Sequence, residues 1–509
     1  MGKRVTVTIE GCPVETQTGC SIAACVMQAN GPALRQSVSG APRGPFCGMG
    51  VCFECRMTVD GTLHQRTCMV NCRDGMRIQN EPATQAPVTP ASKIEADVIV
   101  IGAGPGGIAA AVCAAEAGRR VALIDDNPEG GGQIWRRDAG KPPPRLAADW
   151  LKRLDRNKVD VFTHTQILGS AGPGTLRADG PAGPRAVHHG RLILACGARE
   201  RFVPFPGWTL PGVFGAGGLQ ALVKSGYAVR GQRIVVAGSG PLLLAVAAFL
   251  HEHDANVRLV AEQTPRGKLV RFGASLVLRQ PAKIAEAIGL RWRVRGVPFR
   301  AGCWPLGCEG DGRIVAVTLT DGKNTWTEPC DALACGFGLV PNTELPRHLG
   351  CTLDRGSVRV DDLQQTTVPG VYAVGELTGI GGLDKALLEG QIAGWAATDQ
   401  ADRARTMQEA RRKTPRFATL LEDTFSLRPE LRELARDDTL VCRCEDVPFG
   451  VLKQFSDWRD AKLQTRCGTG PCQGRVCGPA VEFLFGWVHE SGRLPIFPTA
   501  LGNLIEAPM

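Results

Sequence analysis

The sequence predicts a multidomain α/β protein whose centre consists of two dinucleotide-binding units of the Rossmann type. Two segments, residues 97–111 and 233–248, each run from an apolar strand through a glycine-rich turn into an apolar helix. Such a repeat is typical of two parallel-sheet units in one chain. The length of 509 residues exceeds what one core usually holds. Clustered cysteines at 47–68 and 442–477 predict a small additional domain at each end.

Composition argues against several classes of protein. Hydrophobic residues make up 43% and charged residues 21% of the chain, which is typical of globular cores. The net charge of +9 comes from arginines spread along the chain without a basic stripe, so we expect no nucleic-acid partner. The longest apolar run, residues 241–250, is much shorter than the roughly 20 residues of a membrane-spanning helix. We therefore expect no membrane span.

The N-terminal segment shows no export signal. Residues Met1–Glu10 alternate apolar and polar side chains, as a strand does, and lack the apolar centre of a signal peptide. We therefore expect a cytoplasmic protein, either free or held peripherally at a membrane surface by its basic charge. In that reducing compartment the 20 cysteines are not expected to form a disulfide framework, so their spacing carries the information.

The N-terminal residues contain four cysteines with the spacing of plant-type ferredoxins. Cys47, Cys52 and Cys55 lie in one glycine-containing loop, and Cys68 follows thirteen positions later. A C-x4-C-x2-C…C set supplies the four thiolates that two irons need, and glycines let the loop wrap closely over a cluster. Zinc is the alternative, but zinc sites normally pair their cysteines in short knuckles. We predict a β-rich, ferredoxin-like [2Fe-2S] domain here. The cysteines outside the pattern, which we expect to be packing residues, are Cys12, Cys20, Cys25 and Cys72.

The first glycine turn predicts an FAD site. It follows an apolar strand and opens a helix of small residues, a context that makes the G-x-G-x-x-G pattern specific. Gly102 permits the tight turn, Gly104 admits the pyrophosphate, and Gly107 lets helix and strand approach, with the helix N-terminus facing the phosphates. Gly106 belongs to the same turn.

Further positions complete the predicted FAD site. Asp125 ends the next strand, where a carboxylate would bind the ribose hydroxyls of the adenosine half. Gly132 and Gln133 lie in a segment similar to the one that such flavoproteins use near the isoalloxazine. Gly375 and Glu376 end a segment that resembles the late flavin motif of flavoproteins with two dinucleotide domains. Glu376 replaces the usual Asp, which leaves the geometry of its contact to the ribityl chain open.

The second glycine turn is degenerate. Gly238 and Gly240 repeat the first two glycines, but Leu243 occupies the third glycine position. The acidic position after the next strand is Ala261, and Glu262 follows one residue late. The alternatives are NAD(P) bound differently, another nucleotide such as ATP or a flavin, or a unit that keeps the fold without a ligand.

The C-terminal cysteines predict a second [2Fe-2S] cluster. Cys442 and Cys444 form a C-x-C pair, and Cys472 and Cys477 form a C-x4-C pair. The pattern resembles bacterioferritin-associated-ferredoxin-like domains, apart from the wider second pair, and helix N-termini after each pair would offset the thiolate charge. Cys467 lies in the same loop and we expect it to be a bystander; if it ligates instead, the cluster type is open. Zinc is again the alternative.

Composition and motif positions divide the chain into consecutive parts. The predicted parts are a ferredoxin-like domain over 1–80, a linker over 81–96, an FAD-binding domain over 97–215 and 346–402, a second nucleotide-binding-like domain over 216–345, a helical connector over 403–440, and the small helical [2Fe-2S] domain with its tail over 441–509.

In this order, the parts resemble the flavin and iron-sulfur (alpha-type) subunits of bacterial multi-subunit amine and amino-acid dehydrogenases. That family includes hydrogen cyanide synthase, opine oxidases, D-hydroxyproline dehydrogenase and the alpha subunit of sarcosine oxidase. The resemblance covers nearly the whole chain, with the ferredoxin-like small subunit fused at the N-terminus. It implies a hetero-oligomer in which a D-amino-acid-oxidase-type flavoprotein subunit oxidises the amine or amino acid, while this chain relays electrons to an unidentified acceptor.

The residues themselves agree with a relay. No general base or substrate-carboxylate clamp is recognisable beside the flavin motifs, so the catalytic residues stay unassigned. The rival interpretation is a self-contained NAD(P)H-dependent flavin and iron-sulfur oxidoreductase, against which Leu243 and Ala261 argue. Cys303 and Cys308 are candidates for a redox disulfide, but they lie well after the second glycine turn. A third interpretation is an iron-sulfur sensor or scaffold with a vestigial flavin site.

Overall fold

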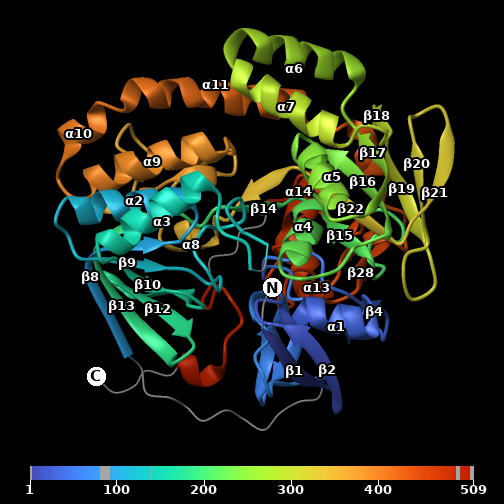
Figure 1. Cartoon of the computed structure of the whole chain (residues 1–509), viewed down its shortest axis with the longest axis horizontal. Helices are drawn as coiled ribbons and strands as arrows, with labels where there is room; N and C mark the ends of the chain where they lie inside the picture. The colour runs from blue at the N-terminus through green and yellow to red at the C-terminus, as the bar shows by residue number, and fades with distance from the viewer. Residues whose placement is uncertain (1–2, 81–91, 139, 489–492, 505–509) are drawn as a thin grey trace.

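The protein consists of two α/β units with a small domain packed against them from each end of the chain (Figure 1). The computed structural model describes residues 3–80, 92–138, 140–488 and 493–504. In these ranges no helix combines the length and the apolar character needed to cross a bilayer. The predicted multidomain α/β class is confirmed.

The N-terminal domain is a five-stranded sheet with one main helix. In β1 (Arg4–Ile9) every second side chain is buried, as the sequence alternation predicts. Ser21 caps α1 (Ile22–Asn30) by accepting a hydrogen bond of 3.2 Å from the Ala24 N–H. The other elements are β2 (Cys12–Gln17), β3 (Arg35–Gln36), β4 (Pro42–Arg43), β5 (Arg56–Val59), β6 (Thr62–Arg66), η1 (Thr67–Met69) and β7 (Arg77–Gln79). The sheet order is β2-β1-β7-β5-β6.

The first α/β unit contains the first glycine turn. Its strand β8 (Ser92–Ile101) begins five residues before the predicted boundary at residue 97, so residues 92–96 belong to the sheet and not to the linker. Residues 81–91 of the predicted linker lie outside the described residues. The other strands are β9 (Val121–Ile124), β10 (Asp160–Phe162), β11 (Gln166–Gly172), β12 (Thr175–Gly180), β13 (Gly183–Leu194) and β26 (Val371–Ala373). Their order is β10-β9-β8-β13-β12-β11, and β26 also pairs with β13, so the chain returns to this sheet after the second unit.

Helices cover one face of this sheet above the glycine turn (Figure 1). They are α2 (Pro105–Glu116), α3 (Arg145–Arg156) and α9 (Leu383–Ala396). Two glycines of α9 bring its backbone against α2, because a Cβ at Gly390 would lie 2.1 Å from the Gly106 carbonyl oxygen, and one at Gly394 would lie 2.5 Å from the Ala110 carbonyl oxygen. The segments on either side of β26 form α8 (Glu344–His348), β24 (Leu353–Asp354), β25 (Ser357–Val358) and η2 (Gly375–Thr378).

The second α/β unit repeats the plan with a five-stranded parallel sheet. Its strand β15 (Val213–Gly215) pairs with β22, so the unit begins before the predicted boundary between residues 215 and 216. Its elements are α4 (Ala216–Lys224), β16 (Arg233–Ser239), α5 (Leu242–Glu252), β17 (Asn256–Glu262), β18 (Phe299–Ala301), β19 (Trp304–Glu309), β20 (Ala316–Thr320), β21 (Thr325–Pro329) and β22 (Ala332–Phe337). The order is β15-β22-β16-β17-β18, with β19-β20-β21 as a separate sheet. The two passages between the units, β14 (Ala198–Glu200) and β23 (Leu339–Pro341), pair with each other.

Helical segments and the C-terminal domain complete the molecule. The helix pair α6 (Arg266–Arg279) and α7 (Pro281–Arg293) lies beside the second unit, and α10 (Ala401–Arg405) and α11 (Gln408–Thr424) lead from the first unit across to it (Figure 1). The C-terminal elements are η3 (Pro429–Glu433), β27 (Leu440–Cys442), β28 (Val447–Pro448), α12 (Phe449–Leu452), α13 (Trp458–Thr465), α14 (Cys477–Phe485) and η4 (Leu501–Asn503).

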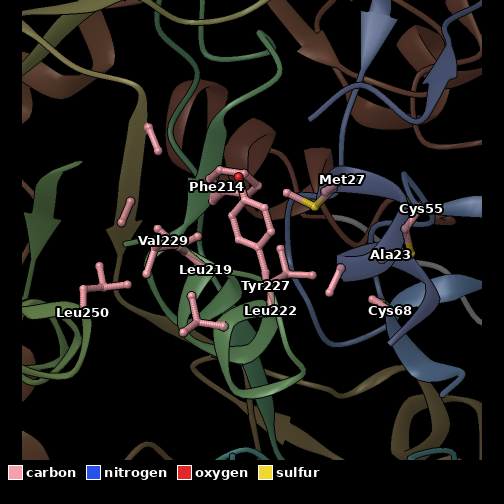
Figure 2. Close-up of a cluster of buried hydrophobic side chains, with 14 of the residues drawn as sticks. Ala23, Met27, Cys55, Cys68, Phe214, Leu219, Leu222, Tyr227, Val229 and Leu250 are labelled. Atoms are coloured by element: carbon pink, nitrogen blue, oxygen red, sulfur yellow. The ribbon is translucent and has the colours of Figure 1, made fainter. Parts of the chain in front are cut away.

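Shared cores join the N-terminal domain to the second unit. Figure 2 shows Ala23 and Met27 of α1 on one side and Phe214, Leu222 and Tyr227 on the other, all within one buried cluster. A second cluster combines side chains of the N-terminal cysteine loop, the second unit and the C-terminal domain. Because burial of apolar area is the main stabilising term in such contacts, the domains form one packed body.

Candidate functional site

The four N-terminal cysteines come together as two pairs of buried thiols. Cys47 is hydrogen-bonded to Cys52, and Cys55 to Cys68. The exposed fraction of these four residues is 5% or less. The N–H groups of Met49 and Cys52 point at the Cys47 sulfur, at 3.5 and 3.4 Å. A [2Fe-2S] cluster has two thiolates on each iron, so two buried thiol pairs, three thiols from the loop and Cys68 from η1, fit that group.

Five C-terminal thiols, not four, form one buried group. Cys444 is hydrogen-bonded to Cys442 and to Cys472. The sulfurs of Cys442, Cys467 and Cys477 all lie within 4.8 Å of one another. The sequence places Cys467 in the loop but does not show that its thiol turns toward the others. All five are buried, Cys467 completely.

Three local structures position these cysteines. Cys442 ends β27, and the turn to β28 carries Cys444. Arg466, at φ 65, ends α13 in the left-handed conformation and turns the chain toward Cys467. Cys477 is the first residue of α14, whose N-terminal dipole favours a thiolate. The donor set and its burial fit a cluster of two irons.

A buried ion pair joins the two cysteine sets. Arg443, between Cys442 and Cys444, donates from Nε to Oε1 of Glu54 at 2.9 Å, and Glu54 lies between Cys52 and Cys55. The two side chains are 2% and 1% exposed, although the residues are 389 positions apart. Each charged residue is thus flanked by candidate ligands of its own set. The two candidate cluster sites therefore lie next to each other.

Neighbouring side chains hold this ion pair. Arg35 contacts the other carboxylate oxygen of Glu54 at 2.6 Å. The Arg443 guanidinium lies 4.4 Å from the ring centre of Phe46 and 5.2 Å from that of Trp208, which is the geometry of cation–π contacts. A second contact between the two end domains is the ion pair of Arg43 with Asp446, at 2.6 Å.

The first glycine turn has the shape of a phosphate site. A Cβ at Gly102 would lie 2.3 Å from the Ala195 carbonyl oxygen, and one at Gly107 would lie 1.8 Å from the Gly102 carbonyl oxygen, so both positions require glycine. A Cβ at Gly104 would meet nothing within 4 Å, which leaves open space at the start of α2. No described side chain caps α2. Open space beside uncapped N–H groups fits a pyrophosphate.

Asp125 follows β9 and lies at this turn, and its contact to the ribose hydroxyls stays a prediction. Its Oδ2 accepts a hydrogen bond from the Ala103 N–H, and its Oδ1 accepts from the Asn127 N–H at 2.7 Å. Burial, followed by the charge of Asp126, raises the pKa of the Asp125 carboxyl above its ordinary value. Gly132 lies over the turn as well, because a Cβ there would lie 2.9 Å from the Gly104 Cα.

Glu376 is held by backbone N–H groups, and its contact to the ribityl chain stays a prediction. Its two carboxylate oxygens accept hydrogen bonds from the N–H groups of Gly381 and Gly382, at 2.7 and 2.8 Å, just before α9 begins. The glutamate is one methylene longer than the usual aspartate, so it reaches the start of this helix. A buried ion pair that the motifs do not reveal, Lys385 with Glu389 at 2.9 Å, holds the neighbouring Gly375 turn.

Arginines connect the flavin turn to the N-terminal cysteine loop. Arg136 donates to the Gly48 carbonyl oxygen at 2.6 Å and to the Asn127 side chain at 3.1 Å. Arg66 donates to the Gly50 carbonyl oxygen at 3.2 Å and to Asp126 at 3.0 Å. Both arginines thus bind the loop that carries Cys47 and Cys52 against the end of β9. Isolated arginines carry no sequence signal for such contacts.

The C-terminal cysteine loop also reaches the edge of the first unit. Arg199 of β14 donates to the carbonyl oxygen of Arg475, which lies between Cys472 and Cys477, at 3.0 Å. Arg199 also binds Asn342 at 2.8 Å, and Asn342 donates to the Cys196 carbonyl oxygen at 2.8 Å. Cys196 follows β13, the neighbour of β8. The C-terminal loop is thus linked to the edge of the sheet that carries the flavin turn through Arg199 and Asn342.

The second glycine turn is covered by the chain itself. Ser239 donates to the Phe425 carbonyl oxygen at 3.1 Å, and Gln263 donates to the Ser426 carbonyl oxygen at 3.2 Å. Leu243 is buried, and Glu262 accepts hydrogen bonds from the N–H groups of Gly240 and Thr264. A segment after α11 thus packs on the edge where a nucleotide would bind. Gly238, Gly240 and Glu262 as nucleotide-binding residues stay a prediction.

The two cysteines of the candidate disulfide in the second unit are buried. Cys303 precedes β19 and Cys308 lies within it, and both are buried. Burial raises the pKa of the Cys303 thiol to about 12, and it also raises the pKa of the Cys308 thiol. A thiolate is the form that attacks a disulfide, so this pair is poorly suited to thiol exchange.

Comparison with known proteins agrees with the geometry. Residues 96–410 match the family model "pyridine nucleotide-disulphide oxidoreductase", and residues 2–83 match "2Fe-2S iron-sulfur cluster binding domain". An opine oxidase subunit of Rhizobium meliloti is 32% identical over 81% of this chain and 98% of its own length. The hydrogen cyanide synthase subunit HcnB of Pseudomonas aeruginosa is 31% identical over 74% of this chain and 90% of its own length.

A solved structure shows the same fold. The L-proline dehydrogenase from P. horikoshii matches with a TM-score of 0.72 and 22% identity, and the match covers 99% of this chain and 98% of that one. At this identity the likeness concerns the fold alone. It extends over all the domains described above.

Proposed function

This chain belongs to the pyridine nucleotide-disulphide oxidoreductase family and carries a 2Fe-2S cluster binding domain, and from this premise we propose that it is the FAD and iron-sulfur subunit of a heteromeric amine, imino-acid or amino-acid dehydrogenase or oxidase. Its role is to relay electrons to an acceptor from a partner flavoprotein subunit. Relatives at 31 and 32% identity are named as subunits of a hydrogen cyanide synthase and of an opine oxidase, which supports a role within a complex.

The observation that carries the proposal is the packing of three candidate redox sites in one contiguous group. The Glu54–Arg443 ion pair joins the two cysteine sets at 2.9 Å, and Arg136 joins the N-terminal loop to the flavin turn at 2.6 Å. A bound flavin exchanges two electrons with a donor and passes them on singly to iron-sulfur clusters. The residues of this chain space the sites, bury the ligands and neutralise charge between them.

The proposed cofactors are one FAD and two [2Fe-2S] clusters. The Gly102–Gly107 turn, Asp125 and the Gly132–Gln133 segment support FAD, with Gly375 held near α9 by Glu389. The first cluster site consists of Cys47, Cys52, Cys55 and Cys68. The second consists of Cys442, Cys444, Cys472 and Cys477. Five buried thiols support the second cluster.

The proposed partner is a flavoprotein subunit of the D-amino-acid-oxidase type that oxidises the substrate. Two carboxylates of the first unit, Asp125 and Glu376, accept hydrogen bonds from backbone N–H groups, and the sequence has no recognisable clamp for a substrate carboxylate beside the flavin motifs. The basic net charge of +9 favours a partner with an acidic face.

The alternative is a self-contained NAD(P)H-dependent oxidoreductase. The cover over the second glycine turn, in which Ser239 and Gln263 bind residues 425–426, weighs against it. Hydride donation there would require this segment to move. The relay requires no movement of residues 425–426, so the structure favours it over the alternative.

The test is an assay of the purified, cofactor-replete chain. D- and L-amino acids, proline analogues, sarcosine and opines are offered with a dye acceptor, first alone and then with the candidate partner subunit. We expect no turnover by the chain alone and turnover with the partner. Robust oxidation of any of these substrates by the chain alone would refute the relay, and rapid reduction of its flavin by NADH or NADPH would favour the alternative.

A further inference from the structure

The C-terminal cysteine group contains one thiol more than a [2Fe-2S] cluster takes. Four thiolates saturate two irons, yet five buried cysteine sulfurs gather here. Cys467 is not at the margin of the group. It has no exposed surface, and its thiol is hydrogen-bonded to those of Cys442 and Cys477.

The contacts divide the five thiols unevenly. Cys444 and Cys472 are hydrogen-bonded to each other, which suits the two ligands of one iron, and Cys444 also contacts Cys442. The remaining three, Cys442, Cys467 and Cys477, form the triangle with all sulfurs within 4.8 Å. Each iron takes two thiolates, so an iron held at this triangle would have three candidate thiols for two ligand positions.

Local structure distinguishes Cys477 from Cys467 within this triangle. Cys477 begins the nine-residue helix α14, whose dipole favours a thiolate and so favours ligation in the resting protein. Cys467 follows the left-handed Arg466, and its N–H binds the Thr465 hydroxyl at 3.2 Å. No helix begins at Cys467. Its sulfur nevertheless lies within 4.8 Å of the sulfurs of Cys442 and Cys477.

We propose that Cys467 is a reserve ligand for the iron that Cys442 and Cys477 hold. If either of these thiolates were lost, the Cys467 thiol would give up its proton to solvent and its sulfur would take the vacant ligand position, so that the cluster would stay in place. If the departing ligand is a thiolate, it takes up a proton, so the exchange leaves the net charge unchanged. This inference rests on the proposed second cluster, but the experiment separates the two.

The experiment compares alanine variants, because alanine cannot ligate iron. The protein is reconstituted anaerobically, and iron, acid-labile sulfide and the electron paramagnetic resonance of the reduced protein are measured. We expect about four irons per chain in the wild type and in Cys467→Ala. In Cys477→Ala we expect about four irons with a shifted C-terminal signal, since Cys467 replaces the lost ligand.

The contrasting variants remove thiols that have no substitute. Cys472→Ala and the double variant Cys467→Ala/Cys477→Ala should each retain about two irons and only the N-terminal signal. Cys330→Ala, a buried thiol outside both groups, is the control and should change nothing. If Cys477→Ala does not fold, as judged by loss of the N-terminal signal and the flavin, Cys442→Ala is measured in its place, with the same expected result.

Two results would overturn the inference. One is loss of the C-terminal signal in Cys477→Ala to the same extent as in Cys472→Ala, and the other is its loss in Cys467→Ala, which would make Cys467 an obligatory ligand. A wild-type protein with about two irons would instead refute the second cluster itself.

Discussion

At the scale of single residues, the contact between Glu54 and Arg443 combines two charges that are almost fully buried, at 1% and 2% exposure. We expect Glu54→Gln to lower the stability of the contact between the two end domains by about 3 kcal/mol, because it leaves the Arg443 charge buried without its partner. The measurement is the denaturation midpoint followed by the visible absorbance of the clusters.

The matched control is an ion pair at the surface. Arg230 and Asp254 are 83% and 62% exposed. Asp254→Asn should therefore lower the free energy of unfolding by less than about 1 kcal/mol. Equal losses of stability in Glu54→Gln and Asp254→Asn would contradict the prediction that breaking the buried pair is the more destabilising change.

Glu200 gives the protein a dependence of stability on pH. Its carboxylate accepts hydrogen bonds from the N–H groups of Gly217 and Gly218 at the start of α4, while burial raises its pKa to about 7. The nearby Cys335 thiol stays neutral, because burial raises its own pKa. A carboxyl with a raised folded pKa stabilises the protein below its unfolded pKa, and this contribution is lost as pH rises through about 7.

We therefore expect the wild type to lose about 3 kcal/mol of unfolding free energy between about pH 4.5 and about pH 8 through this group. Glu200→Gln should flatten the corresponding fall in Tm, whereas Glu95→Gln, at an exposed position of β8, should not. Identical pH profiles in the wild type and Glu200→Gln would contradict the assignment.

At the scale of elements, the packing of α9 on α2 determines the shape of the flavin turn. A Cβ at Gly390 would lie 2.1 Å from the Gly106 carbonyl oxygen, so this helix interior has no room for a methyl group. We expect Gly390→Ala to push the helices apart, to destabilise the first unit by about 1–3 kcal/mol and to lower the FAD content. The FAD content after purification and the Tm are the measurements.

A second helical glycine provides the control for this prediction. A Cβ at Gly289 of α7 would meet nothing within 4 Å. Gly289→Ala should therefore stabilise the protein slightly, by about 0.5–1 kcal/mol, with unchanged FAD content, because alanine favours the helix. Loss of FAD in both variants would mean that the close approach of α9 is not the cause.

At the scale of the whole molecule, the two cysteine sets come from opposite ends of the chain but are adjacent in space. Their ligands nevertheless lie in separate loops, so we expect each cluster to assemble by itself. Cys52→Ala should remove one paramagnetic signal and Cys472→Ala the other, with FAD kept in both. A variant that stays folded but loses both signals would show that the two sites depend on each other.

The sequence by itself determined the parts of this protein. Two local patterns were enough to predict the first cluster site and the flavin turn. They are the spacing of Cys47, Cys52 and Cys55 within one loop, and the glycines of the first turn with their strand and helix. The fold class and the family followed from the order of these patterns and are confirmed by the topology and the comparisons. The predicted domain boundaries were less accurate, because β8 pairs with β13 from Ser92 onward, five residues before the predicted start of the FAD-binding domain.

Only the tertiary structure decided how the parts meet. Glu54 and Arg443 are 389 positions apart, and no spacing rule relates them. From the sequence we expected Cys467 to be a bystander. In the structure the turn after α13 places its sulfur within 4.8 Å of those of Cys442 and Cys477. In each case the deciding contact depends on packing between distant segments, which local sequence patterns do not encode.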